Sequence, residues 1–166
     1  MSTLLQRLAA LFAIAGVAVA CIVAAMVVAS VGGRAAAGAP VPGDVELTQF
    51  GIALAISLGL PWCQWRRANI IVDFFTQKLS PRAQLRLDAI GTLLVAAMCA
   101  LLAWRTAVGA FGMIEARETT MIIGLPMWWT YASLAPGLAL AALIALWQGH
   151  HLWRGREVPL PEGAAE

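Results

Sequence analysis

The chain has 166 residues, of which 61% are hydrophobic and only 12% are charged, and its formal net charge is +2. Soluble domains are typically about 45–50% apolar and about 25% charged. A soluble domain of this size cannot bury so much apolar surface, so the composition excludes an ordinary soluble domain. It predicts an integral membrane protein, for which the lipid bilayer is the solvent.

Charged residues divide the chain into four apolar runs. The first extends from Leu8 to Val31 without a charge, which is enough to cross a hydrocarbon core of about 30 Å. It is also longer than the apolar core of a signal peptide, about 7–15 residues, so we expect a retained helix. The third run gains length at its end because Arg105 can snorkel to the interface. The runs predict an all-α integral membrane protein with four transmembrane helices, at about residues 8–31, 46–65, 85–106 and 126–147.

Lysine and arginine are distributed unevenly between the two sides of this arrangement. The side with the amino terminus, the loop between the second and third spans and the carboxy-terminal tail holds all of the 11 except Arg34, Arg105 and Arg117. Because cytoplasmic loops are enriched in basic residues, we expect both termini in the cytoplasm. Residues 1–153 are then expected to form one transmembrane domain, and residues 154–166 a disordered cytoplasmic tail.

A short apolar segment, residues 69–79, follows the basic pair Arg66–Arg67 and is too short to cross a bilayer. On a helical wheel its apolar side chains cover one broad arc and its polar side chains cover most of the other. We therefore expect an interfacial amphipathic helix in the cytoplasmic loop between the second and third spans. Its apolar face either anchors the loop in the membrane surface or docks a membrane helix of a partner. Ser80 and Pro81 predict the start of the next helix, as N-cap and first helical residue.

Residues near the cytoplasmic ends of the expected spans have the character of membrane-interface anchors. Tryptophan concentrates at the headgroup level, and arginine is attracted there to anionic headgroups. The candidate anchors are Trp62, Trp65, Arg82, Arg86 and Trp147.

The centres of the expected spans contain no acid, base or histidine, although a transporter core or a membrane enzyme needs polar groups at depth. The adjacent pair His150–His151 points in directions about 100° apart on a helix, so it cannot ligate one ion from one face. Cys21, Cys63 and Cys99 form no C-x-x-C motif. We therefore expect no catalytic residue, metal, cofactor or nucleic-acid partner. The residues themselves indicate an accessory or scaffold membrane subunit.

Three groups of residues stand in an order and spacing typical of a known family. The entry to the second span contributes Pro42, Gly43, Asp44, Glu46 and Leu47. The segment after this span contributes Arg66, Arg67, Ile70, Val72, Asp73, Leu79, Pro81 and Arg82. The start of the fourth span contributes Thr119, Thr120, Pro126, Trp128, Tyr131, Pro136 and Gly137. In these motifs the chain, from about Val31 to Leu146, resembles the small membrane subunit of the tripartite ATP-independent periplasmic (TRAP) transporters.

The resemblance implies a secondary transporter of the bacterial inner membrane, in which a periplasmic binding protein captures an organic acid or similar solute. A large multi-span membrane subunit carries the solute together with sodium ions, and the small subunit packs against this large subunit. The expected partners are therefore the large subunit, the periplasmic solute-binding protein and membrane lipids. The candidate partner-interface residues are Glu46, Arg66, Arg67, Ile70, Asp73, Phe74, Phe75 and Trp128.

Three alternatives stay open on the sequence alone. Glu46 is either a charge favoured at the positive end of a helix dipole or a contact to the large subunit or binding protein. Asp73 either contacts Arg66 or Arg67 or lies on a solvated polar face. The alternative function of the whole chain is that of a stand-alone four-helix membrane protein with an enzymatic or redox-support role.

Overall fold

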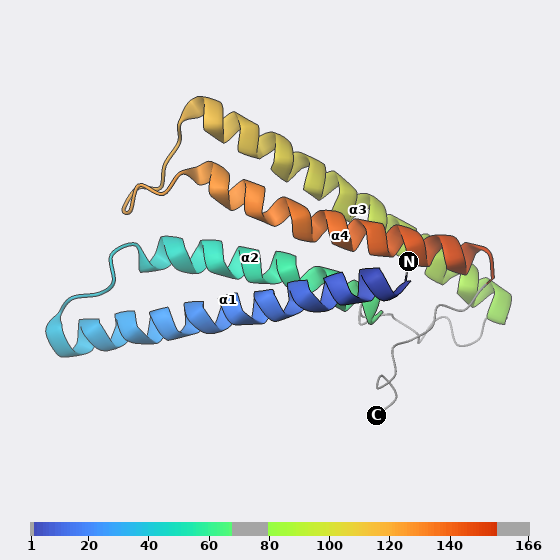
Figure 1. Ribbon diagram of the computed structural model, residues 1–166, viewed down its shortest axis with the longest axis horizontal. Helices are drawn as coiled ribbons and strands as arrows, with labels where there is room; N and C mark the ends of the chain where they lie inside the picture. Colours follow the sequence, from blue (N-terminus) through green and yellow to red (C-terminus); the bar gives the residue numbers. More distant parts are fainter. Residues whose placement is uncertain (1, 68–79, 156–166) are drawn as a thin grey trace.

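The computed structural model describes residues 2–67 and 80–155, and its four helices lie over the four expected spans. They are α1 (Ser2–Ala37), α2 (Asp44–Trp65), α3 (Pro81–Ala116) and α4 (Met127–Trp153) (Figure 1). Each is long and apolar enough to cross a membrane. The prediction of an all-α membrane protein with four transmembrane helices is confirmed. The expected interfacial helix at residues 69–79 lies outside the described residues, as does most of the expected tail.

Two helices are much longer than the spans expected within them. α1 and α3 each contain 36 residues, which corresponds to about 54 Å at about 1.5 Å per residue. A hydrocarbon core of about 30 Å cannot cover such helices at full length, so they project beyond it or tilt. The third span was expected at about residues 85–106; α3 continues past it to Ala116, and Arg105 lies exposed along the helix.

α3 begins where the sequence predicts. Ser80 occupies the N-cap position, and Pro81 is the first helical residue. The Ser80 carbonyl oxygen accepts hydrogen bonds from the amides of Ala83 (2.9 Å) and Gln84 (3.1 Å). The Ser80 hydroxyl makes no capping hydrogen bond, so the proline and the backbone define this helix start.

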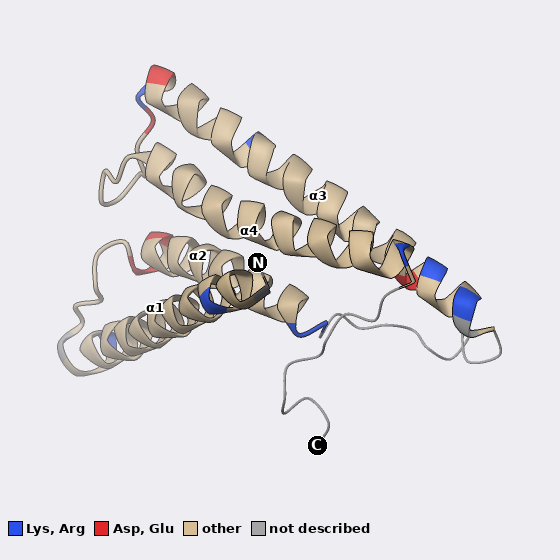
Figure 2. Cartoon of the chain, turned by 45° about the vertical axis from the view of Figure 1, so that its right-hand side comes forward, with Lys and Arg blue, Asp and Glu red and all other residues tan. Residues whose placement is uncertain are grey.

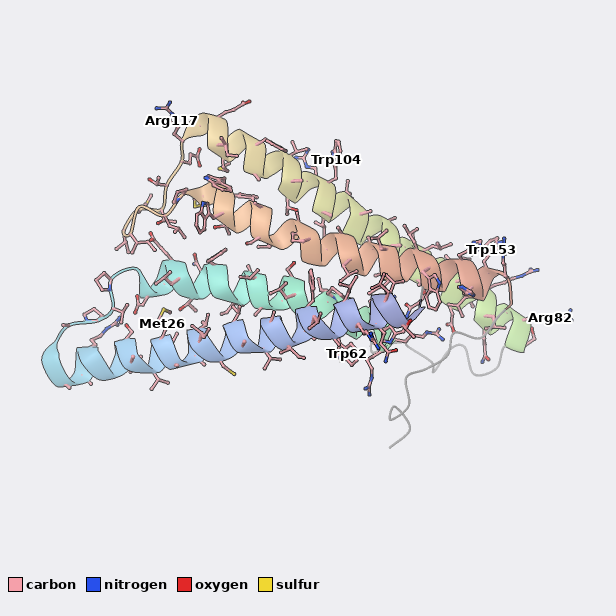
Figure 3. All side chains as sticks on the ribbon, in the orientation of Figure 1. Met26, Trp62, Arg82, Trp104, Arg117 and Trp153 are labelled. Carbon is pink, nitrogen blue, oxygen red and sulfur yellow. The ribbon has the colours of Figure 1, made fainter. Side chains whose placement is uncertain are left out.

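The helices form an open row in the order α1–α2–α4–α3 (Figure 1). α1 packs on α2, and α3 packs on α4, as two antiparallel hairpins joined by the contact between α2 and α4. In the described part of the chain the α3 backbone does not pack along α1 or α2, and Asp88 of α3 reaches the first hairpin only through Arg67, just past the end of α2. The outer sides of the row are therefore uncovered. Trp104, for example, projects from the side of α3 that faces away from α4 and is 69% exposed (Figure 3).

Glycines allow the helices of each hairpin to approach closely. A side chain at Gly16 of α1 would lie 2.9 Å from the carbonyl oxygen of Ala55 in α2. A side chain at Gly149 of α4 would lie 2.8 Å from the side chain of Leu93 in α3. Lipid tails are as apolar as leucine, so such close packing, more than water exclusion, holds membrane helices together.

α2 and α4 cross at Ser57 and Gly137. The Ser57 hydroxyl donates a hydrogen bond of 2.7 Å to the carbonyl oxygen of Leu134. Gly137 has no side chain, which leaves room for the Ser57 backbone. Pro136 cannot donate an intrahelical hydrogen bond at this point, yet α4 continues through it. The Ser57 hydrogen bond thus joins α2 to α4 two residues before this proline.

Apart from Arg105, which lies part-way along α3, the described charges gather at the two ends of the row (Figure 2). We call the end with Ser2 and Trp153 the basic end, because its arginines outnumber its one described acid, Asp88. Its arginines are Arg7, Arg66, Arg67, Arg82, Arg86 and Arg154. The opposite end, which we call the acidic end, carries Asp44, Glu46, Glu115 and Glu118, together with Arg34 and Arg117.

The crossing of α2 and α4 can be tested with Gly137→Ala. The added methyl group would overlap the Ser57 carbonyl, so one helix must shift. We expect a loss of about 1–3 kcal/mol in the free energy of unfolding, measured by circular dichroism during titration of mixed micelles with a denaturing detergent. The matched control is Gly112→Ala in α3, where an added methyl group meets nothing within 4 Å. This control should be neutral or slightly stabilising, and equal stability of both variants would contradict the crossing.

Candidate functional site

At the acidic end, Glu46 fastens the α3–α4 loop to the first turn of α2. Its carboxylate accepts hydrogen bonds from the amides of Ile122 (2.9 Å) and Ile123 (3.3 Å). Gly43, the N-cap residue of α2, has a φ of 72° and lies against the side chain of Ile123. A residue with a side chain at position 43 would clash there and strain the backbone. The candidate interface residue Glu46 thus makes its described contacts within its own chain and joins the two hairpins.

Two adjoining hollows open at the acidic end. The larger, of about 370 Å³, lies beside Glu46, between α2 and the α3–α4 loop. The smaller, of about 230 Å³, is lined by Trp128 and Arg117. Glu118 and Thr119 line both. The Trp128 ring is 37% exposed, so this candidate residue presents part of an aromatic surface beside polar groups, a combination enriched where proteins bind one another.

Asp44 fixes the connection between α1 and α2. Its carboxylate accepts a hydrogen bond of 2.6 Å from the buried hydroxyl of Ser30 and pairs with Arg34 at 3.3 Å. It also accepts a hydrogen bond of 2.8 Å from the amide of Val45. Negative charge at the first turn of a helix is favoured by the helix dipole. The sequence placed Asp44 in a family motif without a role, and the structure shows that it stabilises this turn.

At the basic end, Gln64 and Gln148 connect α2 to α4 inside the row. The Gln64 side-chain amide donates a hydrogen bond of 2.8 Å to the Gln148 side-chain oxygen. The Gln148 amide in turn donates to the backbone carbonyls of Gln64 (3.0 Å) and Trp65 (3.2 Å). The last carbonyls of a helix lack intrahelical partners, so α4 supplies part of the cap of α2. The sequence interpretation missed this pair, although both glutamines interrupt apolar runs and could have marked it.

The tryptophans expected at the headgroup level contact other helices of the row. Trp65 is only 6% exposed and packs among Ala9, Leu140 and Ile144. Its ring stacks on that of Trp147, with 5.6 Å between ring centroids. Its indole N–H has no hydrogen-bond partner within the described residues. Trp65 is therefore covered by protein, and its depth in the bilayer stays a prediction.

The remaining candidate anchors are more accessible. Trp62 and Trp147 are partly buried at the edge of the cluster around Trp65. Arg82 and Arg86 are exposed at the start of α3. Figure 3 shows Trp62 and Arg82 toward the basic end, consistent with the expected anchoring positions, which stay predictions because no membrane is present.

Arg66 and Arg67, the basic pair at the end of α2, make different contacts. Arg67, with a φ of 51°, pairs with Asp88 of α3 at 3.2 Å. Arg66 is the C-cap residue of α2 and lines a groove between α1 and α2. The sequence interpretation did not single out Asp88. The other candidate interface residues of this region, Ile70, Asp73, Phe74 and Phe75, lie outside the described residues.

In residues 2–67 and 80–155, no group of three histidine, cysteine, aspartate or glutamate side chains could hold a metal ion. The His151 ring lies 4.6 Å from the Trp147 ring, between centroids. The described polar groups of both ends therefore make contacts between helices or face the surface.

The contact made by Glu46 can be tested with Glu46→Gln. The neutral amide oxygen is a weaker acceptor than a carboxylate, and only one oxygen remains. We expect amide hydrogen exchange at Ile122 and Ile123 to become several-fold faster, measured by mass spectrometry on the purified protein. The control is Glu115→Gln, at an exposed position of α3. Equal exchange in the wild type and both variants would show that Glu46 does not hold the loop.

The glutamine pair can be tested with a double-mutant cycle. Gln148→Leu removes the three hydrogen bonds that its side chain makes, and we expect a loss of about 1–3 kcal/mol in the free energy of unfolding. The double variant with Gln64→Leu should lose less free energy of unfolding than the two single variants together. Each single change already removes the hydrogen bond between the two side chains, so it cannot be lost twice. Strict additivity would mean that the two side chains do not interact.

Comparison with known proteins gives one family. The model of the family described as "Tripartite ATP-independent periplasmic transporters, DctQ component" matches residues 23–155, which is well over half of the 166 residues. No curated protein and no solved structure matches the chain significantly. The matched region covers the later part of α1, from residue 23 onward, and all of α2, α3 and α4. On this match, the chain belongs to the DctQ family, the small membrane component of TRAP transporters.

Proposed function

We propose that the chain packs against the large multi-span subunit of a TRAP transporter in a bacterial inner membrane and holds the fixed part of that subunit in place. The basic end then faces the cytoplasm and the acidic end the periplasm. Transport is coupled to sodium and takes up an organic acid or similar solute delivered by a periplasmic binding protein. These details rest on the family and on the charge distribution described above.

The open row is the observation that carries this proposal. In the most apolar stretch of α1 only 6% of the residues are buried, compared with 39% in α4. A row with such uncovered helices offers broad apolar surfaces to another membrane subunit. An elevator-type carrier moves one domain against a fixed frame, and a row of helices beside that frame increases its lateral extent.

The buried polar side chains support a structural role. Those described are Ser30, Ser57, Gln64 and Gln148. Each makes hydrogen bonds within the chain. Groups that bind a passing solute must exchange partners, whereas these four groups connect helices. The solute path is therefore assigned to the large subunit. The family is a transporter component, not an enzyme family, which favours this proposal over a stand-alone enzymatic or redox-support role.

The proposal is tested by expressing the tagged chain with the large subunit and measuring their molar ratio after purification in mild detergent. A stoichiometric complex is expected. Trp128→Ala should lower the co-purified fraction about tenfold, because partly exposed aromatic rings often dominate binding energy. The matched control is Trp153→Ala, at the opposite end of α4 and 64% exposed, which should retain the complex.

Two results would count against the proposal. Recovery of the wild-type chain alone, with the large subunit present in the same membranes, would reject packing between the two subunits. An intact complex with Trp128→Ala would reject Trp128 as a contact while leaving the packing itself supported. Solute uptake in proteoliposomes then separates a role in assembly from a role in transport.

A further inference from the structure

α1 and α2 flank an open apolar groove with Arg66 at one end. The groove has a volume of about 720 Å³ and is lined by Ala13 and Gly16 of α1 and by Ala55, Gly59 and Trp62 of α2, among others. Arg66 lies at its end and is the only charged residue among the described residues that line it. Arg67, the neighbouring cation, is already paired with Asp88. Among the described residues no carboxylate pairs with Arg66, whose guanidinium places a positive charge at this end of the groove.

The depth of the groove matches one leaflet of a bilayer. Along α2 it extends from Arg66 to Ala55, which corresponds to about 16 Å of helix. Half of a hydrocarbon core of about 30 Å is about 15 Å. Trp62, which prefers the level of the headgroups and the ester groups, lies one helical turn from Arg66. Charge, aromatic ring and apolar groove thus follow the order of headgroup, glycerol and acyl chain in a phospholipid.

We propose that this groove binds one anionic phospholipid, with an acyl chain between α1 and α2 and the phosphate at Arg66. A guanidinium group donates paired hydrogen bonds to phosphate oxygens. The positive charge favours a lipid with net negative charge over a zwitterionic lipid. The cation at one end favours a phospholipid over an apolar partner helix, because the lipid phosphate supplies the complementary charge. A second hollow of about 560 Å³ continues from Ala20 and Ala55 toward the acidic end, and no charged residue lines it.

The site can be tested on the full chain alone, purified in mild detergent and mixed with phosphatidylglycerol or phosphatidylcholine. Native mass spectrometry then counts the lipids bound to each protein. We expect one retained phosphatidylglycerol and about fivefold weaker retention of phosphatidylcholine. Arg66→Gln should reduce phosphatidylglycerol retention about fivefold and abolish the preference. Gly59→Leu should fill the groove and reduce retention of both lipids, because a side chain at Gly59 meets nothing within 4 Å.

Matched controls distinguish the groove from general effects on the protein. Arg154→Gln removes an exposed charge at the same end, and Gly91→Leu makes the same change on α3, where a side chain also meets nothing within 4 Å. Both should retain lipid like the wild type, with unchanged helix content and elution volume. Equal retention in all proteins, or equal loss in variants and controls, would overturn the proposal. Because the large subunit is absent, this test is independent of the proposed packing.

Discussion

The contact between α2 and α4 is the constraint on which the arrangement depends, because it is the main connection between the two hairpins. Near the middle of the helices, Gly137 lets the backbone of α2 approach α4, and the Ser57 hydroxyl bonds to the Leu134 carbonyl. At the basic end, Gln64 and Gln148 add a buried polar connection. In lipid, where water exclusion contributes little, such close packing and hydrogen bonding must hold the helices together. The hydrogen bonds between Glu46 and the α3–α4 loop secure the other end.

With this contact in the middle, α1 and α3 occupy the two edges of the row. Each edge helix packs mainly on one neighbour, and α1 touches α4 only near Ala9, which explains why so little of α1 is buried. A closed bundle of four helices would bury a central polar or apolar core, whereas this row exposes most of its apolar surface to its surroundings. Lipid and a partner subunit can both cover that surface, and the positions of Arg66 and Trp128 at opposite ends of the row separate the two proposed contacts.

The sequence predicted the elements well and their arrangement poorly. Charge-free runs located the four helices, and Ser80–Pro81 located the start of α3. The expected spans lie within longer helices, because a helix can continue past the apolar layer once a charge such as Arg105 faces outward. The order of the helices was not predicted, since hydropathy reports exposure to lipid and not the identity of neighbouring helices.

The candidate sites were recovered only in part, for a related physical reason. Glu46 and Arg67 were candidate contacts to partners, with a helix-dipole role left open for Glu46. In the structure both bind groups of their own chain, and contact with a partner stays a prediction. A lone charge at a helix end does not reveal which backbone amides or carboxylates the fold brings to it. Gln64 and Gln148 were missed because the search for polar groups at depth considered ionisable residues, whereas two neutral amides satisfy one another without a charge.

The cap that α4 supplies to α2 has a consequence for the biosynthesis of the protein. Gln64 and Gln148 are separated by 84 residues, so at about 5–20 residues per second the ribosome makes the second about 4–17 s after the first. During this interval the last carbonyl oxygens of α2 need another hydrogen-bond donor, and water at the membrane surface can supply it. The hairpin of α1 and α2 is therefore in the bilayer before α4 is made, with water bound at the end of α2. This water is displaced only when α4 packs against α2.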